Sequence, residues 1–151
     1  MRLSTRGEYG VKAMIDLALH YGEGPIALKS VAERQLISEH YLEQLIASLR
    51  KAGLVTSVRG AQGGYELARP PGEITVGDVV RVLEGPIAPV ECVDESQEFS
   101  NCTQSESCVT RIVWKRLRDS ITQVLDSTTL ADLSEEARKM RAREAPPMYY
   151  I

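Results

Sequence analysis

The three cysteines of this 151-residue chain have the most specific chemistry in the sequence, and they lie in one acidic segment. Nine residues separate Cys92 from Cys102, and five separate Cys102 from Cys108. An odd number of clustered cysteines is a poor disulfide framework, and the spacing differs from the paired CxxC of zinc ribbons. Thiolates without histidine favour iron–sulfur ligation. We therefore predict that these cysteines hold an iron–sulfur cluster, with metal-free thiol sensing and three free thiols in a mobile loop as alternatives.

Catalysis by these thiols has little support in the sequence. A cysteine nucleophile needs a base, and the two histidines, His20 and His40, lie on predicted helices rather than beside the cysteines. The chain has no glycine-rich phosphate loop, metalloprotease pair or nucleophile elbow. We expect that the protein is not an enzyme.

A second group of polar residues lies on a predicted helix that Ser38 caps and Gly53 ends. The apolar side chains of this helix form one buried face, made of Leu42, Leu45, Ile46 and Leu49. The opposite face carries hydrogen-bonding groups, which suit a helix that reads a DNA groove. On it, Glu43 can accept from cytosine amino groups and the others can contact phosphates or base edges. The candidate DNA contacts are Ser38, His40, Tyr41, Glu43 and Gln44.

The segment after this helix predicts a β-hairpin, with strands over 54–59 and 65–67 and a glycine-rich turn over 60–64. Arg59 lies just before the turn, where its guanidinium can reach into a narrow minor groove while the glycines let the backbone approach phosphate. The candidate contacts here are Ser57, Arg59 and Gly60. At the start of the first predicted helix, the side chains that suit a phosphate contact are Thr5, Arg6 and Tyr9.

The elements that position these groups follow from capping and periodicity. A first helix is predicted over 5–21, with a capping box of Thr5 and Glu8 and an apolar stripe of Val11, Met14, Ile15, Ala18 and Leu19. A short helix over 28–34 and a turn lead to the groove-reading helix. Two helices joined by a short turn and followed by a hairpin describe a winged helix-turn-helix. We therefore expect a mostly α-helical fold with a small β-hairpin wing, residues 1–70 forming the DNA-binding domain.

The second half of the chain is predicted to connect the DNA-binding domain to a dimerisation helix. Residues 71–85 contain a linking helix, in which Thr75 and Asp78 form a capping box. Residues 86–108 are the cysteine-bearing cluster loop, whose part before residue 108 shows no helical or strand period.

Residues 109–151 are assigned to dimerisation and a C-terminal tail. A long helix over 109–125 carries an apolar stripe, and we expect it to form a homodimer through Trp114, Leu117, Ile121 and Val124. Two short helical pieces, over 127–133 and 134–143, follow, and then an apolar tail over 146–151 that is expected to dock on the protein.

Charge limits how the chain can bind DNA. The formal net charge is −3, which argues against a basic protein held on nucleic acid by bulk charge. Residues 1–70 carry nine basic and seven acidic side chains, net +2, whereas residues 71–151 carry nine and fourteen, net −5. DNA binding is therefore expected to be local. No apolar run is long enough to span a membrane and the N-terminus lacks a secretory signal, so we expect no membrane association and a cytoplasmic location.

Several stretches together resemble one family, the Rrf-type bacterial transcription regulators, and within it the IscR-like iron–sulfur regulators. They are LSTRGEYG, SEHYLEQL, LRKAGLV, VRGAQGGY, ITVGDVVRVLEGP and the three cysteines, and they cover most of residues 1–130. The combination is specific, although each piece alone would be weak.

The resemblance implies a homodimer whose long C-terminal helices cross and whose loop senses a cluster or the state of cysteine metabolism. Two departures stand out: Arg111 occupies the place where IscR-like members usually carry a histidine, and the gap between Cys92 and Cys102 exceeds the usual five residues. Arginine stays protonated and cannot ligate. Because some cluster-sensing relatives use a carboxylate at the start of the partner's first helix, Glu8 is our candidate fourth ligand of a 2Fe-2S cluster.

The function expected from these observations is a homodimeric regulator whose binding to a pseudo-palindromic DNA operator is switched by the cluster, and which controls iron–sulfur biogenesis genes. Two alternatives stay open. One is a thiol-redox or cysteine-metabolism repressor without metal, and the other is an electron-transfer iron–sulfur protein.

Overall fold

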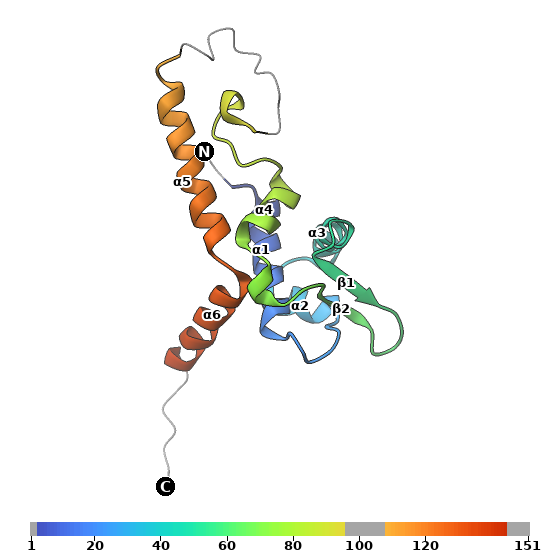
Figure 1. Cartoon of the computed structure of the whole chain (residues 1–151). Helices are drawn as coiled ribbons and strands as arrows, with labels where there is room; N and C mark the ends of the chain where they lie inside the picture. Colours follow the sequence, from blue (N-terminus) through green and yellow to red (C-terminus); the bar gives the residue numbers. More distant parts are fainter. Residues whose placement is uncertain (1–2, 96–107, 145–151) are drawn as a thin grey trace.

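The computed structural model describes residues 3–95 and 108–144. Within these residues the regular secondary structure is helical apart from one antiparallel two-stranded sheet (Figure 1). The helices are α1 (Thr5–Leu19), α2 (Leu28–Gln35), α3 (Glu39–Lys51), α4 (Val76–Glu84), α5 (Arg111–Ser127) and α6 (Leu130–Glu144). The strands are β1 (Val55–Val58) and β2 (Gly64–Leu67), and the 3-10 turns are η1 (Pro71–Glu73) and η2 (Glu91–Val93).

Helices α1, α2 and α3 share one apolar core, to which α1 and α3 contribute side chains at most 2% exposed: Met14, Leu17, Leu42, Leu45, Ile46 and Leu49. The predicted buried face of α3 is confirmed. The stripe expected for α1 is only partly right, because Val11, Ile15 and Leu19 are half-buried while Ala13 and Leu17 are buried. Asp16, also fully buried, accepts hydrogen bonds from Arg34 at 2.7 and 2.9 Å, which join α1 to α2.

The wing follows α3 directly. The Ser38 side chain accepts from the Tyr41 amide at 3.1 Å and so caps α3, as predicted, and Gly53 follows the helix with a φ of +83°. β1 pairs with β2 from Val55 opposite Leu67 to Val58 opposite Gly64. An isolated bridge between Ile26 and Tyr65 attaches the hairpin to the segment before α2.

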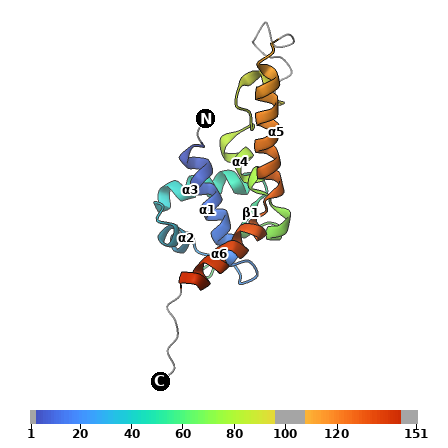
Figure 2. The same cartoon turned by 90° about the vertical axis from the view of Figure 1, so that its left-hand side faces the viewer.

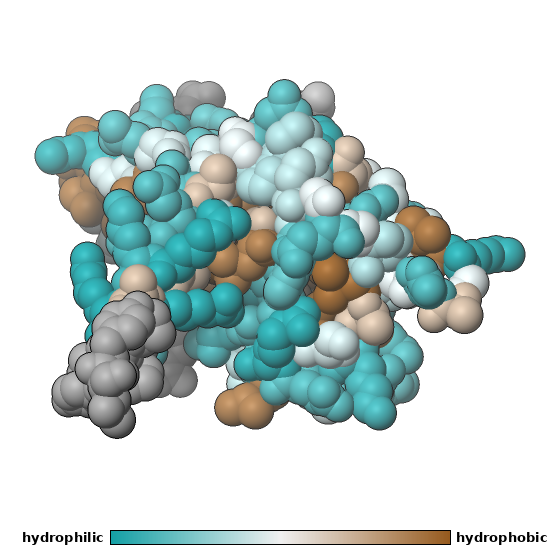
Figure 3. Space-filling view, turned by 90° about the horizontal axis from the view of Figure 1, so that it is seen from below, coloured by the Kyte–Doolittle hydropathy of each residue, from teal (hydrophilic) through white to brown (hydrophobic). Residues whose placement is uncertain are grey.

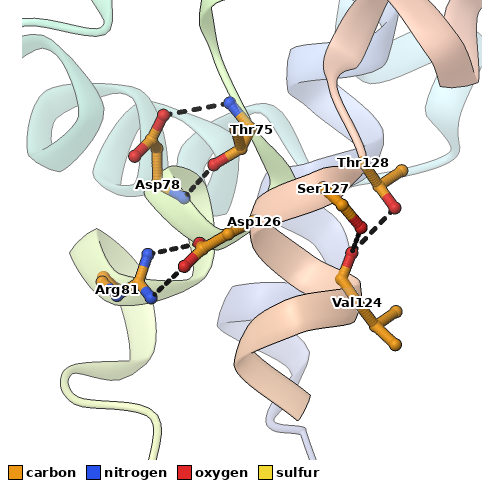
Figure 4. A network of polar contacts seen from close by, with 7 residues as sticks. All are labelled: Thr75, Asp78, Arg81, Val124, Asp126, Ser127 and Thr128. Atoms are coloured by element: carbon orange, nitrogen blue, oxygen red, sulfur yellow. Dashed lines mark hydrogen bonds and ion pairs between the residues drawn. The ribbon is translucent and has the colours of Figure 1, made fainter. Parts of the chain in front are cut away.

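Helix α4 begins at the predicted capping box, in which the Thr75 and Asp78 side chains each accept from the other residue's amide at 3.0 Å (Figure 4). The same figure shows Arg81 of α4 facing Asp126 of α5, with two hydrogen bonds of 2.7 and 2.8 Å. A Cβ at Gly77 would lie 2.0 Å from Asp126 Oδ1, so this pairing requires a glycine there. These contacts hold α5 against α4.

Three expectations are corrected. The capping box of Thr5 and Glu8 does not form, because α1 starts at Thr5 with Ser4 as its N-cap.

The segment after α5 is one helix rather than two pieces, since Ser134 is 3% exposed and donates back to the Ala131 carbonyl at 3.0 Å. The helix start lies instead at Thr129 and Asp132, whose side chains bond each other's amides. The loop after α4 contains one 3-10 turn, η2, although the sequence showed no helical or strand period there.

α1 and α4 lie in the middle of the molecule, with α3 and the wing on one side and α5 on the other (Figure 1). Figure 2 shows α5 standing alongside α4, with α6 crossing below. The end of the molecule seen in Figure 3 is mostly hydrophilic with small separate apolar patches. In the described part of the chain, no helix combines the length and apolarity needed to cross a bilayer. The tail over 146–151 lies outside the described residues.

Candidate nucleic-acid interface and cysteine segment

The polar face predicted for α3 is on the surface. Ser38, His40, Glu43 and Gln44 are exposed, and Tyr41 is half-buried. Gln44 Nε2 lies 3.4 Å from His40 Nε2, one helical turn away. These side chains present donors and acceptors next to one another, as a helix that reads base edges would.

The start of α1 lies against this face. Thr5 Oγ1 is 3.3 Å from the Tyr41 hydroxyl, and the rings of Tyr9 and Tyr41 meet edge to face with centroids 6.2 Å apart. Two groups that were predicted separately therefore form one surface. Lys12 belongs to it as well, because its Nζ lies 5.5 Å from the centre of the Tyr9 ring. Lys12 was not among the contacts predicted from the sequence, although it follows Tyr9 by three residues and so shares its helix face.

The wing extends the same surface. Arg59 and Gly60 are exposed, and Gly60 has a φ of +115°, a conformation that favours glycine. Gly63 has no room for a side chain, since a Cβ there would lie 2.1 Å from the Val58 carbonyl oxygen. Arg50 of α3 donates to the Ser57 hydroxyl at 3.2 Å and ties the wing to α3.

The cysteine segment approaches the start of α5. Cys92, in η2, and Cys108, just before α5, are both half-buried. Cys108 Sγ lies 2.9 Å from Thr110 Oγ1. The Thr110 side chain, and then the Arg111 and Thr110 amides, lower the pKa of the Cys108 thiol. Cys102 lies outside the described residues.

Arg111 bonds to both described cysteines through their carbonyls. Its Nε donates to the Cys92 carbonyl at 3.4 Å, and its amide donates to the Cys108 carbonyl at 3.2 Å. Arg111 therefore bonds to the backbone of two cysteines that are 16 residues apart in the sequence. Among the described residues no three His, Cys, Asp or Glu side chains are placed to hold a metal ion. Glu8 is exposed on α1, and no hydrogen bond or ion pair joins it to the described part of this segment.

The apolar stripe predicted on α5 is largely uncovered in the single chain. No residue of α5 is buried. Val113, Leu117 and Val124 are 55%, 39% and 63% exposed, and Trp114 and Ile121 are half-buried. Asp126 of the same helix bonds to Arg81 of α4.

Residues 3–136 match the model of the Rrf2 family, which is described as an iron-dependent transcriptional regulator. The chain belongs to the Rrf2 family. It is 52% identical over 134 residues to the HTH-type transcriptional regulator CymR of Bacillus subtilis, covering 89% of this chain and 90% of that protein. It is 44% identical over 133 residues to the HTH-type transcriptional regulator IscR of Pectobacterium carotovorum, covering 88% and 79%.

Solved structures agree with this assignment. The structure of CymR, the global cysteine regulator of B. subtilis, has a TM-score of 0.75 and 49% identity, covering 90% of this chain and 98% of that one. The structure of T. potens IscR has a TM-score of 0.76 and 55% identity, covering 99% and 97%. The expected family and the winged-helix fold are confirmed. This Rrf2 protein is a DNA-binding transcription regulator.

Proposed function

We propose that this Rrf2 regulator binds a pseudo-palindromic operator as a homodimer and that an iron–sulfur cluster on its three cysteines switches this binding. The regulated genes would include those of iron–sulfur cluster biogenesis. The observation that carries the proposal is that Arg111 bonds to the backbone carbonyls of both Cys92 and Cys108, at the start of the helix proposed to form the dimer.

DNA binding is proposed to use the surface formed by the start of α1, the exposed face of α3 and the wing. Its continuity supports the proposal, because Tyr41 contacts Thr5 and Tyr9, and Arg50 contacts Ser57. α3 would enter the major groove while Arg59 reaches the minor groove. The three residues at the start of α1, Thr5, Arg6 and Tyr9, would contact the backbone and set the register.

Homodimerisation is proposed through the exposed stripe of α5. Burying a large apolar side chain from full exposure is worth about 1.5–3 kcal/mol. Leu117 and Val124, which are 39% and 63% exposed, and the half-buried Trp114 and Ile121 would each contribute part of that on both protomers. Two-fold symmetry would then place the two α3 helices about one DNA turn, roughly 34 Å, apart. A pseudo-palindromic operator follows from that geometry.

The residues present fit an iron–sulfur cluster. Ligation needs thiolates, and the lowered pKa of Cys108 favours that form. The cluster would be held by Cys92, Cys102 and Cys108. Because iron supply and oxidants control whether such a cluster is present, its gain or loss would give the regulator two states. In this chain Arg111 would hold the cysteine segments together through their backbone carbonyls instead of acting as a ligand.

A metal-free regulator of cysteine metabolism or thiol status is the second candidate. The 52% identity to CymR favours it, and so does the absence of the usual histidine at Arg111. Electron transfer, the remaining alternative, has no such support, because the named relatives are transcription regulators.

Absorption spectroscopy of the anaerobically purified protein separates the two candidates. We expect a coloured protein with stoichiometric iron and sulfide, and colourless protein when Cys92, Cys102 or Cys108 is replaced by alanine. Operator affinity, measured by fluorescence anisotropy, should differ between the loaded and apo forms. A colourless, iron-free sample after reconstitution would support thiol sensing and contradict the cluster.

Glu8 is proposed as the fourth ligand, supplied by the partner's α1. Its carboxylate is exposed and takes no part in capping α1, so it is available for ligation. We expect Glu8→Ala to shift the visible spectrum and shorten cluster lifetime, whereas Glu33→Ala, an exposed acid on α2, should change neither. An unaltered spectrum and lifetime in Glu8→Ala would refute ligation by Glu8.

A further inference from the structure

Helix α1 has no cap of its own. Its N-cap residue is Ser4, whose side chain does not accept a hydrogen bond from the helix, and the third helical residue is Gly7, which has no side chain. In an ordinary capping box these two positions bond to each other's amides. An uncapped first turn leaves amide groups without partners and frays.

Glu84, the last residue of α4, supplies both missing bonds. Its Oε1 accepts from the Ser4 amide at 3.0 Å and from the Gly7 amide at 2.9 Å, and the Ser4 hydroxyl also donates to it. One carboxylate from 77 residues beyond Gly7 therefore replaces a whole capping box. The negative charge also suits the positive end of the α1 dipole.

Residues at the start of α1 pack closely against Glu84 and its neighbour Leu83. A Cβ at Gly7 would lie 2.6 Å from Glu84 Oε1, and a Cβ at Gly10 would lie 1.9 Å from Leu83 Cδ1. Arg6 Nε donates to the Leu83 carbonyl at 3.3 Å. The hydrogen bond from Ser4, and then the amide bonds from Gly7 and Ser4, lower the pKa of Glu84, so the carboxylate is charged at neutral pH.

The residues that Glu84 caps are those proposed to contact DNA. Thr5 and Arg6 are the first two residues of α1, and Thr5 also lies beside Tyr41 of α3. We propose that Glu84 is a positioning residue for operator binding, which caps α1 across the fold and holds Thr5 and Arg6 in the conformation that contacts the DNA backbone. This rests on the proposed DNA contacts of α1.

The physical reason is preorganisation. If the first turn of α1 is already ordered, binding does not have to order it, and less of the interaction free energy is lost. The effect should therefore appear in the affinity of the folded protein for DNA as well as in its stability. A purely structural cap would change stability alone.

The test compares Glu84→Ala, Glu84→Gln and the control Glu73→Ala, an exposed acid of η1. The probe is the tightest-binding duplex that the wild-type protein selects from a randomised DNA library. Loss of a cap corresponds to about 2- to 30-fold weaker binding, which we expect for Glu84→Ala under conditions where urea titration shows every variant folded. Glu84→Gln keeps an accepting oxygen and should recover part of the affinity, and Glu73→Ala should match the wild type.

Two further readouts distinguish positioning from a structural role. Arg6→Ala should cost less affinity in the Glu84→Ala background than in the wild type, because Arg6 is then already displaced. Gly7→Ala, which displaces the carboxylate by its Cβ, should reproduce the affinity loss while retaining Glu84.

The proposal would be overturned if Glu84→Ala bound DNA with unchanged affinity, or if Arg6→Ala lowered the affinity equally in both backgrounds. Neither result would contradict the proposed DNA-binding surface. If the wild-type protein selected no duplex, the proposed operator binding and the positioning role would fail together.

Discussion

Arg59 illustrates how one exposed side chain can matter for binding without mattering for the fold. It lies beside Gly60 at the wing and makes no hydrogen bond or ion pair with another described residue, so its removal disturbs no packing. We expect Arg59→Ala to lose about 1–3 kcal/mol of operator binding with unchanged stability. Gel-shift titration measures this, and Arg138→Ala, an exposed arginine of α6, is the matched control. Equal operator affinity of Arg59→Ala and wild type would rule out the minor-groove contact.

Glu43 should contribute selectivity rather than affinity. Its carboxylate is exposed on α3, where it repels phosphates and acceptor-lined base edges unless a cytosine amino group donates to it. We expect Glu43→Ala to bind additional sequences in a library selection, whereas Glu33→Ala on α2 should select the wild-type set. If Glu43→Ala recovers no new sequences and loses all affinity, the discriminating role is wrong.

At the scale of elements, α5 leaves its apolar stripe without a cover. Charges at Leu117 and Ile121 cannot be buried in a dimer interface without a large desolvation cost. We expect Leu117→Asp with Ile121→Asp to sediment as a monomer that remains folded, because no residue of α5 is buried in the single chain. Arg116→Asp with Gln123→Asp, two exposed positions on another side of α5, should remain a dimer. A dimeric Leu117/Ile121 double variant would place the interface elsewhere.

The elements differ in how far local sequence predicts them. α3 and α4 were predicted well because Ser38, Thr75 and Asp78 bond to amides three residues away, within reach of pattern analysis. α1 was given the wrong cap because Glu84 is remote in sequence. The break at Ser134 was also wrong, and here a local signal existed, the box of Thr129 and Asp132.

At the scale of the whole molecule, the core of the DNA-binding helices extends beyond the predicted boundary at residue 70. Ile74, Val79, Leu83 and Leu130 belong to the same core and are at most 6% exposed. Each such side chain is worth about 1.5–3 kcal/mol when buried, so a fragment ending at residue 70 would lose about 6–12 kcal/mol. That approaches the whole stability of an ordinary domain, about 5–15 kcal/mol.

We therefore expect a fragment of residues 1–70 to lack the cooperative urea transition that the full chain shows by circular dichroism. The fragment would act as a self-sufficient domain only if its transition had the midpoint of the full chain. The boundary at residue 70 is a sequence prediction that this experiment tests.

Local sequence alone determined the order of helices and hairpin, the buried face of α3 and the exposed polar groups, because these depend on interactions between residues one to four positions apart. The tertiary structure decided what those groups touch. It joined Tyr41 to Thr5 and Tyr9, bonded Arg111 to the Cys92 carbonyl, and assigned the α1 cap to Glu84. These contacts span 19 to 80 residues, and no periodicity or capping rule reports them, since they arise only when separate elements pack.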